Sequence, residues 1–199
     1  MQSSTYTPLP LYPLSLGASY FTPRQELPAH LNLDDPAVLA MTDLRQVAAV
    51  TIEPNASLDK ALQKMIESGV KLLLVIDPQH AVLGLITATD IQGERPLIFL
   101  KEVGVRYDDI LVRDIMTLRE QLEVLRYEDV LQAPVGAIVA TMQAAGRQHA
   151  LVMDVDVLEM RKSLRGIFSA TQLGRQLGVP IYTMEVISRF SVLRESLAS

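Results

Sequence analysis

The sequence predicts an α+β fold made of two tandem copies of one β-α-β-β-α unit, packed with pseudo-two-fold symmetry. Over residues 58–77, apolar residues at helical spacing are followed by a glycine and by an apolar run that ends in aspartate. The same pattern returns 77 residues later, over 135–154. Residues 84–90 also return as 166–172, at an offset of 82. The seam between two such copies is a place where a ligand can bind.

The first copy contains every element of the unit in order. β-Branched residues predict the first strand, and Ser57 and Gly69 are a suitable N-cap and C-terminal stop for the first helix. A continuous apolar run predicts a buried strand, and a turn at 77–80 leads into its partner. The expected elements are strand 47–52, helix 57–69, strands 72–76 and 82–86, and a helix from 87–90 to about Val103 that Gly93 and Pro96 interrupt.

The second copy follows the same order after a connection at 110–116. Pro134 suits the first turn of its first helix, which should end before Gly146. The segment 154–163 is five residues longer than its counterpart, which explains the change of offset, and it is expected to be a loop. The other expected elements are strands 122–125, 150–153 and 165–168 and a helix that begins near Ala170.

The two ends of the chain differ from the repeats. Residues 1–36 hold six of the eleven prolines and form either a flexible arm or an extended strap packed on the body or on a partner subunit. Residues 184–197 place apolar side chains at helical spacing, which predicts an amphipathic helix for core or dimer packing. The expected organisation is an arm at 1–36, repeats at 37–104 and 105–183, and a C-terminal helix at 184–199.

Composition narrows the classes of function. The net charge of −5 argues against broad nucleic-acid binding, which needs a basic face. The absence of cysteine excludes disulfides, thiolate metal sites and cysteine nucleophiles, and a reducing cytoplasm fits by default. No apolar run reaches the roughly 18 residues of a membrane span, and no signal peptide is evident. We therefore expect a cytoplasmic protein with no membrane or nucleic-acid partner.

The unit resembles the cystathionine β-synthase-type (CBS) domain, and two in tandem resemble a Bateman module. The resemblance is carried by 75–77, by Gly-Leu-Ile-Thr-Ala-Thr-Asp at 84–90 and by Asp-Ile-Met-Thr at 114–117. The second copy departs from it, with Ser169 and Gln172 where the first has Thr87 and Asp90. The resemblance implies two clefts for adenine ligands (AMP, ADP, ATP or S-adenosylmethionine), a homodimer, and an unknown effector protein regulated in trans.

The candidate site begins at Thr87 and Asp90. An ionised aspartate can hold both ribose hydroxyls, and the helix N-terminus that follows favours a phosphate. Thr-x-x-Asp before a helix is equally a capping box that needs no ligand, and both roles can coexist. The resemblance implies that this pair faces Arg147, Gln148 and His149, with Arg147 and His149 holding phosphate. The remaining implied residues are Met116 and Thr117 beside the adenine, and Lys71, Ser169 and Gln172 in a second, weaker cleft.

Two functions follow from these expectations. The first is a regulatory module that binds an adenine nucleotide as a ligand rather than as a cofactor. The alternative is a protein-interaction scaffold with vestigial clefts, which the glutamine at position 172 favours. The three histidines lack metal-ligand spacing, and no catalytic signature is evident, so we expect neither a metal site nor an enzyme.

Overall fold

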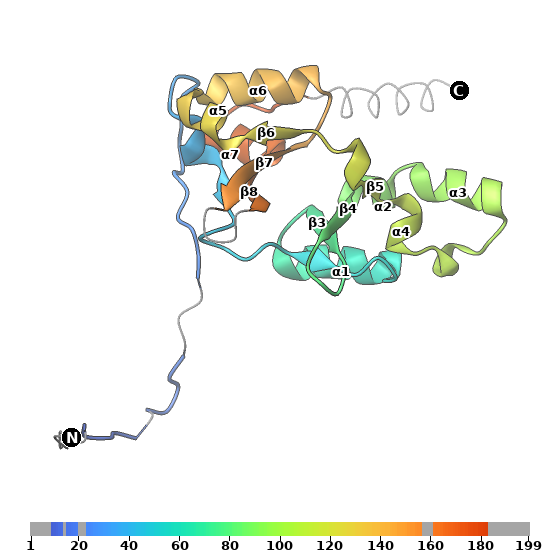
Figure 1. Cartoon of the computed structure of the whole chain (residues 1–199), viewed down its shortest axis with the longest axis horizontal. Coiled ribbons are helices and arrows are strands. Elements are labelled where there is room, and N and C mark those ends of the chain that lie inside the picture. Colours follow the sequence, from blue (N-terminus) through green and yellow to red (C-terminus); the bar gives the residue numbers. More distant parts are fainter. Residues whose placement is uncertain (1–8, 14, 20–22, 157–160, 183–199) are drawn as a thin grey trace.

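The computed structural model describes residues 9–13, 15–19, 23–156 and 161–182. Two four-stranded sheets lie side by side in two halves of the molecule (Figure 1). The sheet of the first repeat has the order β2 (Thr51–Ile52), β3 (Leu72–Ile76), β4 (Val82–Thr87) and β5 (Thr117–Leu118). The sheet of the second has the order β1 (Thr42–Asp43), β8 (Arg161–Ser169), β7 (His149–Asp156) and β6 (Val124–Arg126). The α+β class with two tandem units is thereby confirmed.

The helices of the first repeat begin and end where the sequence predicts. Ser57 accepts a hydrogen bond from the Lys60 amide at the start of the first helix, and Gly69 ends it in the left-handed conformation. The second predicted helix is two helices, because the chain leaves helical geometry at Gly93 and restarts with a proline in the first turn. These helices are α1 (Leu58–Ser68), α2 (Ala88–Gln92) and α3 (Arg95–Val103), and a further short helix, α4 (Val112–Ile115), lies in the connection expected at 110–116.

The second repeat carries three helices and is preceded by a short 3-10 turn. Pro134 is the N-cap of the main helix, one position earlier than predicted. The helices are α5 (Tyr127–Gln132), α6 (Val135–Ala144) and α7 (Ala170–Leu177). The 3-10 turns are η1 (Ala37–Ala40) before the first repeat, and η2 (Tyr107–Asp109) and η3 (Arg119–Gln121) between the repeats.

In each sheet, one edge strand comes from the segment that leads into the other repeat. β1 precedes the first repeat but pairs with β8 of the second, whereas β5 leads toward the second repeat but pairs with β4 of the first. The partners include Gly166 and Gly84, which are the repeated glycines. A Cβ at Gly84 would collide with the Thr117 carbonyl, and one at Gly166 would collide with the Met41 side chain. The repeated glycines therefore permit this exchange of edge strands.

Each half has its own hydrophobic core between its sheet and its helices. Leu73 and Val75 belong to the first core, and Val152 and Phe168 belong to the second. Alternate residues of the same strands point the other way, as the two-residue period of a strand requires. Three of these are buried outside both cores, and we assign them to the seam between the sheets: Leu72, Leu74 and Leu151.

Part of the N-terminal segment packs on the second repeat. Gln25 donates to the Met41 carbonyl and accepts from the Asp43 amide, which extends the corner formed by β1. Leu31 is buried in the second core, and its amide donates to the Gln176 carbonyl. Residues before 20 that the structure describes are exposed, including Leu9, Leu11 and Leu16. Residues 25–31 thus contribute to the fold of the second half.

Three predicted elements need correction. The strand expected at 47–52 is limited to Thr51–Ile52, because only these residues pair with β3. The strand expected at 122–125 is Val124–Arg126. The loop expected at 154–163 is mostly an extension of the β7–β8 hairpin, whose pairing continues to Asp156 and Arg161. The predicted C-terminal helix lies outside the described residues. None of the described helices is long and apolar enough to span a membrane.

Candidate functional site

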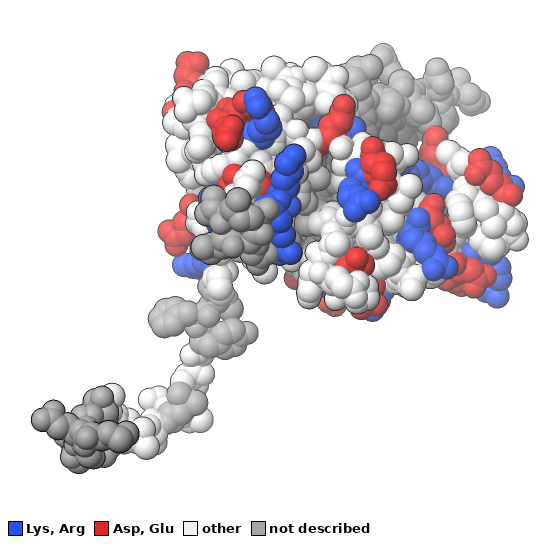
Figure 2. All heavy atoms as spheres, viewed as in Figure 1, with Lys and Arg blue, Asp and Glu red and all other residues white. Residues whose placement is uncertain are grey.

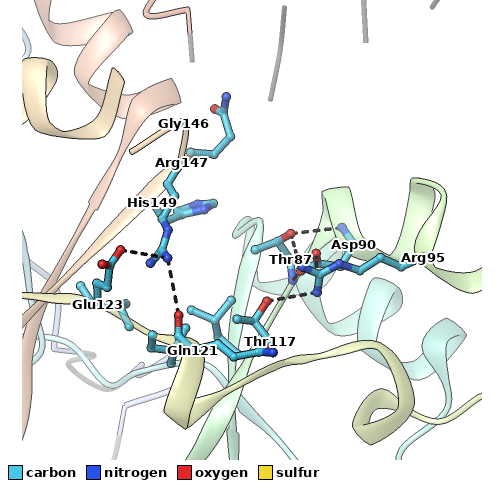
Figure 3. Close-up of a pocket in the computed structure, with 13 residues that line it drawn as sticks. Thr87, Asp90, Arg95, Thr117, Gln121, Glu123, Gly146, Arg147 and His149 are labelled. Atoms are coloured by element: carbon cyan, nitrogen blue, oxygen red, sulfur yellow. Dashed lines mark hydrogen bonds and ion pairs between the residues drawn. The ribbon is translucent and has the colours of Figure 1, made fainter. Parts of the chain in front are cut away.

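A cavity of about 490 Å³ lies between the two repeats and is lined by residues of both. One wall comes from the β4–α2 junction, the start of α3 and β5 of the first repeat's half, and the other comes from the approach to β6 and from the α6–β7 junction (Figure 3). The volume lies within the roughly 300–1,000 Å³ that small-molecule sites occupy. The cavity brings together six of the predicted site residues: Thr87, Asp90, Thr117, Arg147, Gln148 and His149.

Thr87 and Asp90 form the capping box that begins α2. The Thr87 amide and hydroxyl both donate to Asp90 Oδ2 at 2.8 Å, and the Asp90 amide donates to Thr87 Oγ1 at 3.2 Å. The Asp90 side chain is only 10% exposed. One carboxylate oxygen is therefore committed to the helix cap, and the other remains for a partner in the cavity.

Arg95 is that partner, and sequence reasoning missed it. Its guanidinium lies 3.1 Å from Asp90 Oδ1, and it also donates to the Ile115 carbonyl and to Thr117 Oγ1. These contacts fix Asp90, Thr117 and the start of α3 relative to one another on one wall (Figure 3). The available signal was its position, one turn after Asp90 at the start of the interrupted helix.

Arg147 stands on the opposite wall. Its guanidinium lies 3.1 Å from Glu123 Oε2 and 3.5 Å from the Gln121 carbonyl (Figure 3). Glu123 is 83% exposed and Arg147 is 40% exposed, so this ion pair is solvated and contributes little to stability. An anion that enters the cavity can therefore compete with Glu123 for Arg147. Each wall of the cavity thus contributes one arginine, Arg95 on the first and Arg147 on the second.

His149 lines the same wall at the start of β7. Burial, together with the nearby positive charge of Lys71, lowers the pKa of His149 from 6.5 to about 4. The ring is therefore neutral at pH 7 and offers one N–H donor and one acceptor rather than a positive charge. A neutral ring can still hold a phosphate by a hydrogen bond, and the positive charges among the lining residues are those of Arg95 and Arg147.

A smaller apolar space of about 260 Å³ adjoins the repeat 2 wall. It shares Arg147, His149 and Leu151 with the first cavity, and Leu125, Met142 and Ala150 continue its lining. The site thus combines a polar cavity that can take phosphate and ribose with an apolar neighbour that can take a flat ring.

Comparison with known proteins agrees with this architecture. Residues 40–95 match the model of the CBS domain family. An uncharacterised conserved protein from Pyrococcus horikoshii superposes with a TM-score of 0.50 at 25% identity, over 72% of this chain and 92% of that one. Residues 40–95 thus match the CBS domain, and the chain as a whole shares the fold of this solved structure. CBSX2 of Arabidopsis thaliana, in its crystal structure with AMP, gives a TM-score of 0.50 at 20% identity, over 71% and 93% of the two chains. No curated protein matches in sequence.

The other predicted site residues lie outside this cavity. Met116 packs against the first core and lines a shallow pocket with Arg95 and Phe99, outside the 490 Å³ cavity. Gln172 donates to the Ala40 carbonyl at 3.1 Å, so its amide holds η1 against the second repeat. Ser169 is the N-cap of α7 but makes no side-chain cap bond. Lys71 is exposed and lies near His149.

Proposed function

We propose that the cavity between the two CBS repeats binds an adenine nucleotide and that the protein is a regulatory module. One observation carries the proposal: Thr87, Asp90 and Arg95 face Arg147, Gln148 and His149 around one ligand-sized cavity. The polar residues that recognise ribose and phosphate thus come from both repeats. The AMP complex of CBSX2, which shares this fold, supports the choice of adenine ligand.

Each wall has a distinct part in the proposed complex. Asp90 Oδ1 retains lone-pair capacity beside Arg95, so it can accept a ribose hydroxyl while Oδ2 keeps the helix cap. Arg147 exchanges Glu123 for a phosphate oxygen, and Arg95 adds a second positive charge across the cavity. Neutral His149 contributes one hydrogen bond. The base occupies the adjoining apolar space.

Regulation follows from the ligand's position between the repeats. A ligand that contacts both walls favours the arrangement in which the walls are correctly spaced, and it shifts the population toward that arrangement. A partner protein that binds one arrangement better than the other is then coupled to nucleotide concentration. A homodimer would present two such modules to that partner.

The test is calorimetric titration with AMP, ADP, ATP and S-adenosylmethionine. We expect Arg147→Gln to weaken the best ligand by about 10- to 100-fold, because a hydrogen bond to a charged group contributes roughly 1.5–3 kcal/mol. Arg147 is preferable to Asp90 as a target, since loss of Asp90 also breaks the α2 cap. Arg106→Gln is the matched control, an exposed arginine paired with Asp108 outside the cavity. Equal affinity in wild type and Arg147→Gln would contradict the proposal.

The scaffold alternative is favoured by a different observation. Both oxygens of Asp90 already have protein partners, and Gln172 holds η1, so neither residue requires a ligand. If no adenine compound binds, this reading gains support and the N-terminal segment becomes the first region to test. The appropriate deletion is residues 1–22, because Gln25 and Leu31 are part of the packed second half.

A further inference from the structure

A second, larger cavity of about 640 Å³ lies in the same seam, toward the hairpin ends of the two sheets. The two repeats line it with matched positions: Leu74 and Leu151 are 77 residues apart, and so are Ile76 and Met153. The cavity therefore lies at the pseudo-two-fold axis that relates the two repeats. The residues of the predicted second cleft, Ser169 and Gln172, do not line it.

The floor of this cavity is apolar and its rim is basic. Aliphatic side chains from β3, β4, β6, β7 and β8 form the floor, including Leu74, Val82 and Leu164. The charged or titratable side chains at the rim are His80, Arg119, Arg161 and Lys162. Among the described residues that line the cavity, none is aspartate or glutamate. The charged side chains among the described lining residues are thus all basic, in a chain whose net charge is −5.

This lining differs from that of the first cavity. Acidic and basic side chains are mixed over the face shown in Figure 2. In the first cavity, each arginine lies beside a lining carboxylate, Arg95 beside Asp90 and Arg147 beside Glu123. In the second cavity, Arg119 pairs with Glu120, whose side chain is 66% exposed and does not line the cavity. Such an exposed pair is weak and can be exchanged for a ligand anion.

The β3–β4 turn places its histidine at this rim in an uncommon backbone conformation. His80 has φ of 62°, the one positive φ among the described residues other than glycine. Asp77 holds the turn, because its carboxylate accepts from the Gln79 and Ala81 amides and its carbonyl accepts from the His80 amide. Glycine would adopt this conformation at lower cost, so the histidine stands at this rim at the expense of some backbone strain.

We propose that this second cavity binds an amphipathic organic anion. The apolar body of the anion lies on the aliphatic floor, and its carboxylate or phosphate lies at the basic rim. Positive groups on an apolar floor select such a compound over a neutral one of the same length, because a charge-assisted hydrogen bond is added to apolar burial. Leu122 and Leu151 line both cavities, so an occupant here contacts the wall of the proposed nucleotide site.

The experiment titrates the full chain with sodium decanoate and, separately, with decanol. We expect decanoate to bind at least tenfold more tightly than decanol. The variant Arg119→Glu/Lys162→Glu should weaken decanoate at least tenfold and leave decanol within about twofold. The matched control is Lys101→Glu/Arg106→Glu, which makes the same change of charge at exposed positions outside this cavity. It should leave decanoate binding within about twofold.

A second variant tests the floor independently of charge. Ala49 lines the cavity, and Ala49→Leu should weaken decanoate and decanol together by filling part of the volume. Circular dichroism establishes that each variant is folded. The proposal is overturned if wild type does not bind decanoate, if both charge-reversed variants lose it equally, or if Arg147→Gln abolishes it, which would place decanoate in the first cavity. Failure of AMP to bind leaves these outcomes unchanged.

Discussion

The repeats exchange edge strands at two corners, where β1 pairs with β8 and β5 pairs with β4. The strand pairing is antiparallel at both corners, but the side chains are charged at one and apolar at the other. At the corner of the second repeat, Asp43 on β1 receives two hydrogen bonds of 2.8 Å from Arg165, and the guanidinium lies 4.4 Å from the centre of the Tyr127 ring. At the corner of the first repeat, Leu118 and Leu83 occupy the equivalent positions, at offsets of 75 and 82. A buried ion pair joins these positions at one corner, whereas both positions are leucine at the other.

The polar side chains beside the two corners also differ in where they lie. In the second repeat the polar groups near the corner are engaged in holding the leading segment, with Gln25 on β1 and Gln172 on Ala40. In the first repeat, Arg95 holds the corresponding segment, because it donates to the Ile115 carbonyl and to Thr117 Oγ1. Arg95 and Thr117 also line the cavity in the seam, together with Asp90. The polar side chains at the second repeat's corner thus serve packing, whereas those beside the first repeat's corner also line the cavity.

The largest expected effect is at the ion-paired corner. Asp43→Ala should lower the free energy of unfolding by about 3–5 kcal/mol, because it leaves a largely buried arginine without its main partner. The counterpart Leu118→Ala should cost less than about 1 kcal/mol, since Leu118 is 44% exposed. Urea unfolding at pH 7 measures both.

A double variant sharpens the same comparison. Asp43→Leu with Arg165→Leu copies the residues of the first repeat's corner, and it should recover much of the stability lost in Asp43→Ala. If Asp43→Ala costs no more than Leu118→Ala, the ion pair does not hold the corner, and the proposed difference between the repeats is wrong.

The second prediction concerns the paired glycines. Gly84→Ala should cost about 1–3 kcal/mol, because the new methyl group meets the Thr117 carbonyl in a strand pairing that cannot move freely. Gly166→Ala should cost less, because the Met41 side chain can change rotamer. A double-mutant cycle with Met41→Ala separates the cases: it should reduce the cost of Gly166→Ala and leave that of Gly84→Ala unchanged. Equal coupling at both glycines would contradict this account.

The repeat in the sequence was sufficient to predict the α+β class and the two units, whereas the facing of Thr87 and Asp90 toward 147–149 was implied by the resemblance to the CBS domain. Periodicity, capping residues and glycine stops are local signals, and they placed α1, β3 and β4 within about a residue. These local signals could not place Met116 or Arg95. The direction in which Met116 faces and the distance that the Arg95 side chain reaches toward β5 both depend on tertiary packing. The hairpin extension at 154–163 was missed because polar residues there still pair as a strand.

The charge state of His149 likewise depends on tertiary surroundings, and its counterpart 77 residues earlier is Leu72. The pKa of His149 is about 4 in the folded state against 6.5 when unfolded. The unfolded chain therefore binds more protons between these values, and stability that is complete above pH 6.5 is lost as the pH falls toward 4.

The third prediction replaces His149 by its counterpart in the first repeat. Between pH 7 and 4.5, wild type should lose of order 2 kcal/mol more than His149→Leu in urea unfolding. Exposed His80→Leu is the control and should lose stability in parallel with wild type. Parallel curves for wild type and His149→Leu would show that His149 is not held neutral.

A bound phosphate would stabilise the protonated ring of His149. Saturating AMP should therefore reduce the loss of stability at low pH in wild type and not in His149→Leu. That result would show that His149, whose counterpart in the first repeat is Leu72, lies close to the phosphate of the proposed ligand.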